Sequence, residues 1–239
     1  MRYRIGTSGW SYSHWISIFY PENLDRRKWL SFYASHFYTV EVNSTFYRLP
    51  FENMVKGWVN KTPDDFSFSV KGWRLITHKK KLRNVDEDVE IFMKRMSIFG
   101  SKLEVILWQL PPSLKKDVVL LREFLSLLPR NVKHAVEFRH SSWFDDDIYQ
   151  LLEEYGIALC IADSMKFRSP WVKTTSFVYA RFHGPEKLYA SGYSREQLEE
   201  FARNLKRLDS DSFVYFNNDF GGYALENART LKEILSEML

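Results

Sequence analysis

The amino-acid sequence predicts an α/β protein, a single (β/α)8 barrel of the TIM type. Strand-like runs alternate with helix-like runs along the chain, and eight strand candidates fit into its 239 residues. Such alternation is typical of a parallel sheet with helical crossovers, and eight parallel strands in about 250 residues match the barrel. No low-complexity segment, charge block or Gly/Ser linker divides the chain, so we expect one domain over residues 1–239.

Each strand candidate is a short run rich in apolar, β-branched or aromatic residues. The eight runs are 3–8, 39–44, 66–71, 103–109, 134–139, 158–163, 177–183 and 212–217. A doubly wound open sheet is the alternative architecture. Against it, the chain reads GTSGWSY at the first strand rather than G-x-G-x-x-G, and no G-x-x-x-x-G-K occurs anywhere.

The segments between the strands have helical period and punctuation. We expect helices near 24–35, 54–61, 89–96, 118–128, 146–155, 198–205 and 223–238. Ser194 with Gln197 three residues later is typical of a capping box. Segment 164–176, SMKFRSPWVKTTS, has no helical period and a proline in its middle. We therefore expect an irregular connection in place of the helix between strands six and seven.

Composition limits where the protein works and what it binds. No apolar run approaches the roughly eighteen residues of a membrane span, and the first residues lack the apolar core of a signal peptide. We expect a cytoplasmic protein without a membrane partner. The single Cys160 fits a reducing compartment and a buried, small apolar role. With 34 basic against 30 acidic residues, the charge of +4 admits an anionic partner without demanding one.

Polar residues gather at the ends of the predicted strands. Strand residues alternate sides, so Glu41 and Asn43 share one face while Val40 and Val42 share the other. Because strand ends meet at the functional mouth of a barrel, these side chains should form a ring. The expected ring comprises Glu41, Asn43, Lys71, Gln109, Glu137, Arg139, Asp163, Arg181, His183, and Asn217 or Asn218, depending on register.

The charges of this ring suggest two roles. Glu41, Glu137 and Asp163 are the catalytic candidates, because acids packed beside bases acquire displaced pKa values suited to proton transfer. The cations that would hold a phosphate or carboxylate of the substrate are Lys71, Arg139 and Arg181. Three charges of each sign also fit a self-compensated network with an architectural role.

Neutral side chains complete the expected binding site. Asn43, Gln109, His183, Asn217 and Asn218 offer hydrogen bonds to a polar substrate. Aromatic residues follow several strand ends, and Trp10 and Tyr47 are candidates for stacking on a sugar or a base. The other members of this set are Tyr12, Trp15, Phe46, Trp73 and Trp143. Burial over the top of the barrel is the alternative role for each ring.

The sequence predicts no cofactor and no metal site. Neither H-x-H nor H-E-x-x-H occurs. The alternative is a single divalent ion held by Glu41, Glu137, Asp163 and His183. The three neighbouring cations would oppose it.

Several longer segments resemble those of one known family. In chain order they are GTSGWSY (6–12), FYP (19–21), VEVNSTFYRLP (40–50), TH (77–78), LWQLPPS (107–113), EFRHSSW (137–143), RFHGP (181–185) and YFNND (215–219). Together they resemble the YecE-like family, also called domain of unknown function 72. The resemblance implies a (β/α)8 barrel related in shape to the xylose isomerase and endonuclease IV barrels. It implies no activity, because the family is named for lacking one.

These observations lead us to expect an enzyme with acid/base chemistry, hydrolase-like or lyase-like, on a sugar-like or phosphorylated small molecule at the barrel mouth. Nucleic-acid binding or processing is an alternative, from the pI near 9.0, the basic run HKKKLR (78–83) and the kinship of the barrel. A non-catalytic scaffold, with its mouth plugged by salt bridges and aromatic rings, is another.

Overall fold

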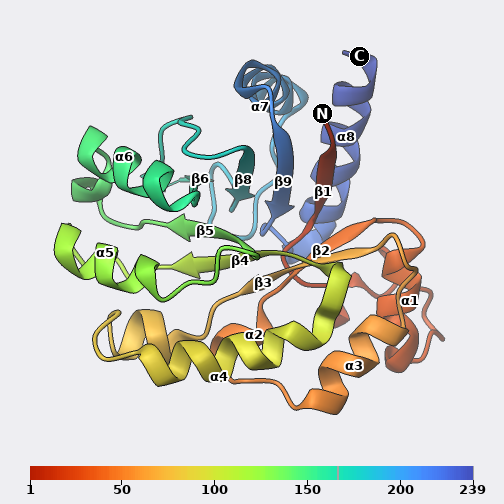
Figure 1. Cartoon of the computed structure of the whole chain (residues 1–239). Helices are drawn as coiled ribbons and strands as arrows, with labels where there is room; N and C mark the ends of the chain where they lie inside the picture. The colour runs from red at the N-terminus through yellow and green to blue at the C-terminus, as the bar shows by residue number, and fades with distance from the viewer. Residues whose placement is uncertain (166, 239) are drawn as a thin grey trace.

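Eight parallel strands form a sheet that curls into a nearly closed barrel, with helices around its outside (Figure 1). The computed structural model describes residues 1–165 and 167–238. The barrel strands are β1 (Tyr3–Thr7), β2 (Thr39–Val42), β3 (Ser67–Lys71), β4 (Leu103–Gln109), β5 (Lys133–Glu137), β6 (Ala158–Ser164), β8 (Phe177–Phe182) and β9 (Asp211–Phe216). Their order, β1-β9-β8-β6-β5-β4-β3-β2, follows the chain around the barrel. The predicted fold class is confirmed.

Helices follow most strands and cover the barrel (Figure 1). The α-helices are α1 (Trp29–Ala34), α2 (Ser44–Tyr47), α3 (Glu52–Asn60), α4 (Asp86–Met96), α5 (Val118–Ser126), α6 (Asp146–Tyr155), α7 (Arg195–Leu208) and α8 (Tyr223–Glu237). A π-helical turn spans Leu75–Lys79, and 3-10 turns span Ser13–Trp15, Arg26–Lys28, Ser97–Lys102, Ser141–Trp143 and Phe220–Gly222. Within the described ranges, no helix is both long and apolar enough to cross a membrane.

Local signals placed most of these helices correctly. The predicted capping box is confirmed, because the Ser194 hydroxyl accepts from the backbone of Gln197 and the Gln197 side chain accepts from the backbone of Ser194. Two short elements, α2 and the π turn Leu75–Lys79, are not indicated by the sequence pattern. A single turn is too short to show a hydrophobic period, so only its tertiary setting determines it.

The connection from β6 to β8 contains no helix among its described residues, as predicted. A two-residue strand, β7 (Phe167–Arg168), instead pairs antiparallel with the end of β6. Two hydroxyls from this segment then bind the backbone of β6: Ser169 Oγ accepts from Ala162 N at 2.7 Å, and Thr174 Oγ1 accepts from Leu159 N at 2.8 Å. The segment thus satisfies backbone groups that would otherwise be buried without partners.

The barrel interior is filled by alternate residues of the strands. Apolar or aromatic members lie below the mouth: Val105, Leu107, Ala135, Ala158, Cys160, Phe177, Tyr179, Phe213 and Tyr215. The hydroxyl of Tyr215 lies 2.8 Å from both Thr39 Oγ1 and Ser69 Oγ, so this layer also joins three strands by hydrogen bonds. Cys160 is a buried free thiol, in agreement with its predicted apolar role.

The barrel closes where β1 meets β2. A parallel bridge joins Ser8 to Glu41, and Gly9 N donates to the Glu41 carbonyl at 2.8 Å. Below this bridge the two strands approach so closely that a Cβ on Gly6 would lie 2.3 Å from the carbonyl oxygen of Thr39. Only glycine fits there without displacing the backbone.

We therefore expect Gly6→Ala to lower the free energy of unfolding by about 1–3 kcal/mol, because the added methyl group forces the strands apart. Gly57→Ala is the matched control, since a Cβ at Gly57 in α3 would meet no atom within 4 Å. That change should stabilise the protein by up to about 1 kcal/mol through helix propensity. Urea unfolding of both variants measures the two effects. Equal effects would contradict the close approach of β1 and β2 at Gly6, the seam of the barrel.

Candidate active site

The carboxyl ends of β2, β5 and β8 each place a charged side chain inside the barrel. Glu41 lies on β2, Glu137 ends β5 and Arg181 lies near the end of β8. All three are almost completely shielded from solvent. The period-two pattern that predicted an inward Glu41, with Val40 and Val42 buried on the other side, agrees with this arrangement.

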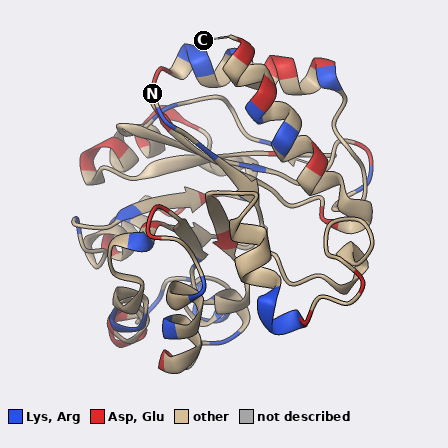
Figure 2. Ribbon diagram, turned by 90° about the vertical axis from the view of Figure 1, so that its right-hand side faces the viewer, with Lys and Arg blue, Asp and Glu red and all other residues tan. Residues whose placement is uncertain are grey.

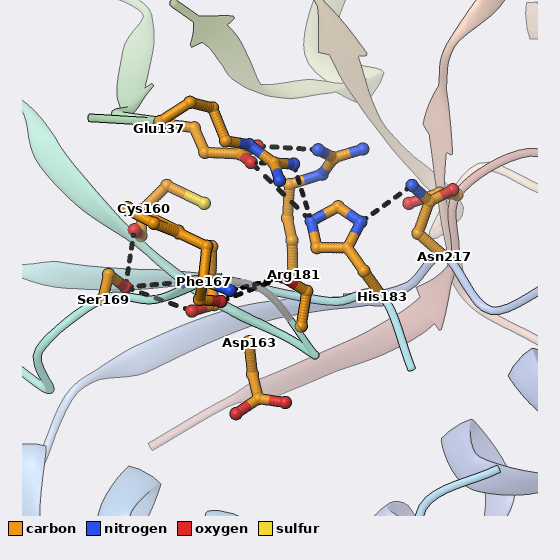
Figure 3. A network of polar contacts seen from close by, with 12 residues as sticks. Glu137, Cys160, Asp163, Phe167, Ser169, Arg181, His183 and Asn217 are labelled. Atoms are coloured by element: carbon orange, nitrogen blue, oxygen red, sulfur yellow. Dashed lines mark hydrogen bonds and ion pairs between the residues drawn. The ribbon is translucent and has the colours of Figure 1, made fainter. Parts of the chain in front are cut away.

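Arg181 connects the two carboxylates, and Figure 3 shows its side of the contact with Glu137. Its Nη2 and Nε atoms donate to Glu41 Oε1 at 2.8 and 3.2 Å, and its Nη1 donates to Glu137 Oε2 at 2.6 Å. One guanidinium therefore ties together strands that are far apart in the sequence. Charged hydrogen bonds of this kind are the strongest in proteins, and burial makes each partner depend on the others.

Further donors surround both carboxylates. Tyr179 OH donates to Glu41 Oε2 at 2.6 Å, and Ser8 Oγ donates to Glu41 Oε1 at 2.7 Å. Arg139 forms an ion pair with Glu137 Oε1. Ser8 and Tyr179 were absent from the predicted ring. The alternation that placed Arg181 inside also places Tyr179 there, two residues earlier, so extending that pattern down the strand would have found it.

These contacts keep both carboxyl groups ionised. Burial alone would raise the pKa of Glu41, but Arg181 and the hydrogen bonds from Tyr179 and Ser8 hold it below the ordinary value of 4.5. Burial acts on Glu137 in the same direction, and Arg139 with Arg181 holds its pKa well below 4.5. At neutral pH, therefore, both groups accept hydrogen bonds and neither has a proton to give.

His183 lies beside Glu137, between this carboxylate and Asn217 (Figure 3). Its Nε2 is 3.6 Å from Glu137 Oε1 and 3.0 Å from Arg139 Nη2, while Asn217 Nδ2 lies 3.0 Å from its Nδ1. Burial, reinforced by Arg181 and Arg139, lowers the pKa of His183 to about 4 despite the nearby carboxylate. The imidazole is therefore neutral at neutral pH.

Lys71 ends β3 and has a different environment from the two arginines. Its amine makes no hydrogen bond or ion pair with the described residues, and it lies over the face of the Phe46 ring, 4.1 Å from the ring centroid. Burial, followed by repulsion from Arg181, lowers the pKa of Lys71 to about 7, although Glu137 and Glu41 oppose this shift. The site thus contains an amine that exchanges its proton near neutral pH.

Asp163 is not part of the charged ring. Its position at the end of the strand had predicted that it would point into the barrel, and that prediction is wrong. Alternation along β6 puts Cys160 inside the barrel and Asp163 on the opposite side, and Figure 3 shows its carboxylate directed away from Glu137 and Arg181. There it accepts from Tyr193 OH at 2.8 Å and pairs with Arg168 Nε at 3.0 Å.

The departure of Asp163 changes the charge of the site. Three cations, Lys71, Arg139 and Arg181, now face two carboxylates, so the ring carries one excess positive charge when Lys71 is protonated. The four-residue metal set expected as an alternative is not assembled, because Asp163 faces away. Among residues 1–165 and 167–238, no group of three or more His, Cys, Asp or Glu is arranged to hold a metal ion.

The expected amide ligands divide between two sides of the barrel. Asn217 contacts His183 inside the mouth, whereas Asn218 donates to Ser191 O and Asn227 Oδ1, both at 2.9 Å, and so fastens α8. Gln109 ends β4 in register with Glu137 and makes no side-chain hydrogen bond within the described chain. Asn43 follows β2 and lines an open groove beside the mouth.

The aromatic candidates also separate. Trp15 and Trp143 are completely buried, so they belong to the core, which was the alternative expectation for them. Trp10 is half-buried and lines the same groove as Asn43. Tyr47 is 68% exposed and contacts the ring of Phe46 edge-on at 5.2 Å, outside the ring of charges.

The fold is that of a TIM barrel, and its buried, charged ring lies at the carboxyl ends of the strands, the face where the active sites of TIM-barrel enzymes lie. The pattern of the family described as "Protein of unknown function DUF72" matches residues 4–238. The chain belongs to this family. The predicted resemblance to the YecE-like proteins is confirmed.

Relatives agree with this assignment. The chain is 30% identical to the UPF0759 protein YunF of Bacillus subtilis, over 97% of this chain and 94% of that protein. It is 32% identical to the UPF0759 protein YecE of Escherichia coli, over 67% of this chain and 58% of that protein. The crystal structure of a DUF72 family protein from Thermotoga maritima has a TM-score of 0.88 at 32% identity, covering 99% of this chain and all of that one.

A more distant structure confirms only the fold. The DUF72 family protein from Enterococcus faecalis has a TM-score of 0.85 at 22% identity and covers 98% of this chain and 95% of its own. Both solved relatives therefore share the barrel. None of these names gives an activity or a ligand.

We expect Arg181→Met to lower the free energy of unfolding by about 3–5 kcal/mol at neutral pH, because it leaves Glu41 and Glu137 buried without their shared partner. The lowered pKa values of the two carboxyls stabilise the fold fully above pH 4.5, and this contribution is lost as pH falls through the lowered values. The difference between variant and wild type should therefore shrink in acid. Urea unfolding at neutral and acidic pH measures it.

The control for that experiment is Arg122→Met, which removes an exposed 2.8 Å pair with Glu154. Its cost should be below about 1 kcal/mol. Equal losses from the two variants would contradict the assigned role of Arg181.

Lys71 should react with an amine-directed reagent such as trinitrobenzenesulfonate at a rate that rises with pH through about 7, its lowered pKa. An unperturbed lysine reaches the same fraction of neutral amine only near pH 10.4. Peptide mass spectrometry of samples labelled over a range of pH gives the rate for each lysine, and Lys71→Met identifies the signal. A Lys71 rate that rises only near pH 10 would refute the shift.

Proposed function

We propose that the protein is an enzyme that binds a sugar-like or phosphorylated anion at the mouth of the barrel and moves a proton with Lys71. The main support for this proposal is the amine of Lys71. It has no polar partner among the described residues, because Arg181 already binds the two neighbouring carboxylates, Glu41 and Glu137. The Lys71 side chain is half-buried rather than closed off from solvent. Its amine therefore lies beside a closed network of ion pairs without joining it, and it is available to a ligand that enters the mouth.

The proposed substrate is an anion because of the charge balance. Two carboxylates leave one of three cations uncompensated, and Asp163, the third acid expected from the sequence, is paired with Arg168 elsewhere. A phosphate or carboxylate beside Lys71 and Arg139 would neutralise this excess. Arg139, with a side chain 13% exposed, lies nearer to solvent than Arg181 and is the second anion ligand in this proposal.

Lys71 takes the proton-transfer role in place of the carboxylates. In its neutral form the amine accepts a proton from the substrate, and as an ammonium it returns that proton to the product or the leaving group, so no other reactant is needed. A pKa of about 7 lets both forms coexist at neutral pH. Glu41 and Glu137 stay ionised, hold Arg181 in place and stabilise positive charge as it develops on Lys71.

Nucleic-acid processing has less support at the mouth. The basic run HKKKLR is partly neutralised, because Lys80 pairs with Asp88 at 2.5 Å and Arg83 pairs with Asp117 at 3.4 Å. On the side of the molecule seen in Figure 2, basic and acidic segments are interspersed along the helices. A small molecule that enters the ring is therefore the better supported substrate.

The proposal is tested by incubating the protein with a panel of sugar phosphates and hydroxy acids and following each compound by NMR. Turnover of a panel member should rise with pH through about 7, as Lys71 loses its proton. Lys71→Met and Lys71→Arg should each lose about 10²–10⁴-fold in kcat, because neither side chain exchanges a proton near neutral pH. The control is Lys79→Met. Lys79 is the exposed last residue of the π turn that follows Lys71, so this variant should keep full activity.

Full turnover by Lys71→Met would refute the assigned role of Lys71. A failure of every panel member to bind or react would refute the proposed substrate class.

A further inference from the structure

An open groove lies beside the mouth and has a charge distribution unlike that of the ring. Its volume is about 430 Å³, within the range of small-ligand sites, and the segments after β1 and β2 form one wall. Four cationic side chains line it, and no Asp or Glu does: they are Arg26, Arg27, Arg48 and Lys61. We call this cavity the basic groove.

Most of these cations lack an internal partner. Arg27 is bound by Asp25 through contacts of 2.5–3.1 Å. Arg48 and Lys61 form no ion pair with the described residues, and Arg26 makes only a 3.4 Å bond to Ser11 Oγ and lies 5.2 Å from the Trp29 ring. Uncompensated positive charge on a concave surface attracts anions strongly.

The walls between these cations are apolar and aromatic. Trp10 and Trp58 contact each other edge-on at 5.7 Å, and both are half-buried and line the groove. Leu30 and Met54 also contribute to the lining. The side-chain amide of Asn43 makes no hydrogen bond within the described chain and lies on the wall nearest Glu41.

This combination selects the chemistry of a ligand. An inorganic anion alone would leave the tryptophan surfaces uncovered, and an uncharged aromatic molecule would leave the cations uncompensated. Guanidinium groups fit phosphate oxygens, indole surfaces stack on flat bases, and an amide such as Asn43 pairs with polar ring edges. A nucleotide unit carries all three features.

We propose that the basic groove binds a nucleotide unit, with its phosphate at Arg48, Lys61 and Arg26 and its base against Trp10 and Trp58. This binding site is separate from the proton transfer proposed at Lys71, and the proposal does not depend on that reaction. The unit has two sources, a free mononucleotide or one residue of a single-stranded nucleic acid, and the same groups recognise both.

The test is isothermal titration of the whole protein with AMP, adenosine, inorganic phosphate and a short single-stranded oligoadenylate at low salt. AMP should bind more tightly than adenosine or phosphate, and its affinity should fall as salt is added. The double variant Arg48→Gln, Lys61→Gln should weaken AMP binding at least about 10-fold, as expected for the loss of charged hydrogen bonds. Both residues are exposed, so the fold should tolerate the changes.

The matched control is Arg203→Gln, Arg207→Gln on α7, which removes the same net charge at exposed positions outside the groove. Its AMP affinity should stay within about 2-fold of wild type. Oligoadenylate that binds at least about 10-fold more tightly than AMP would identify a strand as the source, and equal affinities would identify the free nucleotide.

Two results would overturn the proposal. One is that neither AMP nor the oligonucleotide binds at low salt. The other is that both double variants weaken binding equally, because net charge alone would then account for the affinity.

Discussion

The guanidinium of Arg181 is the interaction on which the mouth of this barrel depends. It joins the Glu41 and Glu137 carboxylates of β2 and β5 to β8, and all three side chains are almost completely shielded from solvent. A buried charge is tolerated only with a partner, so none of the three side chains is stable there alone. Glu41 also belongs to the seam where β1 meets β2, which makes barrel closure and the charged ring parts of one arrangement.

This arrangement shifts the pKa values of the titratable groups in the ring by different amounts and in different ways. The arginines lower the pKa of the carboxyl groups and keep them ionised, while burial lowers the pKa of His183 and keeps the imidazole neutral. Lys71 lies between these extremes, because burial and the arginines lower its pKa and the carboxylates limit the shift. The ring therefore leaves one group free to exchange a proton at neutral pH, and it does so through compensation between its other members.

The barrel and most of its mouth could be predicted from the sequence, because alternation and strand-end position are local signals. β6 was the exception: ALCIAD is apolar on both faces, so nothing in it indicates which side Asp163 takes. The lowered pKa of Lys71 also lay out of reach of the sequence, since it depends on burial and on Arg181 and Arg139, which are distant in the chain. The basic groove was missed for a related reason. Arg26 comes from the connection between β1 and β2, whereas Arg48 and Lys61 lie far apart in the connection between β2 and β3, so the three form no motif.

The segment after β2 links the two sites and shows how they differ. Glu41 points into the barrel and has all its charge matched, whereas Asn43, two residues later, faces a groove whose cations are largely unmatched. Matched charge in a closed interior stabilises the fold and tunes neighbouring groups, while unmatched charge in an open cavity stays available to a ligand. One short strand end thus separates the matched carboxylate of Glu41 from a groove whose cations are available to an anion.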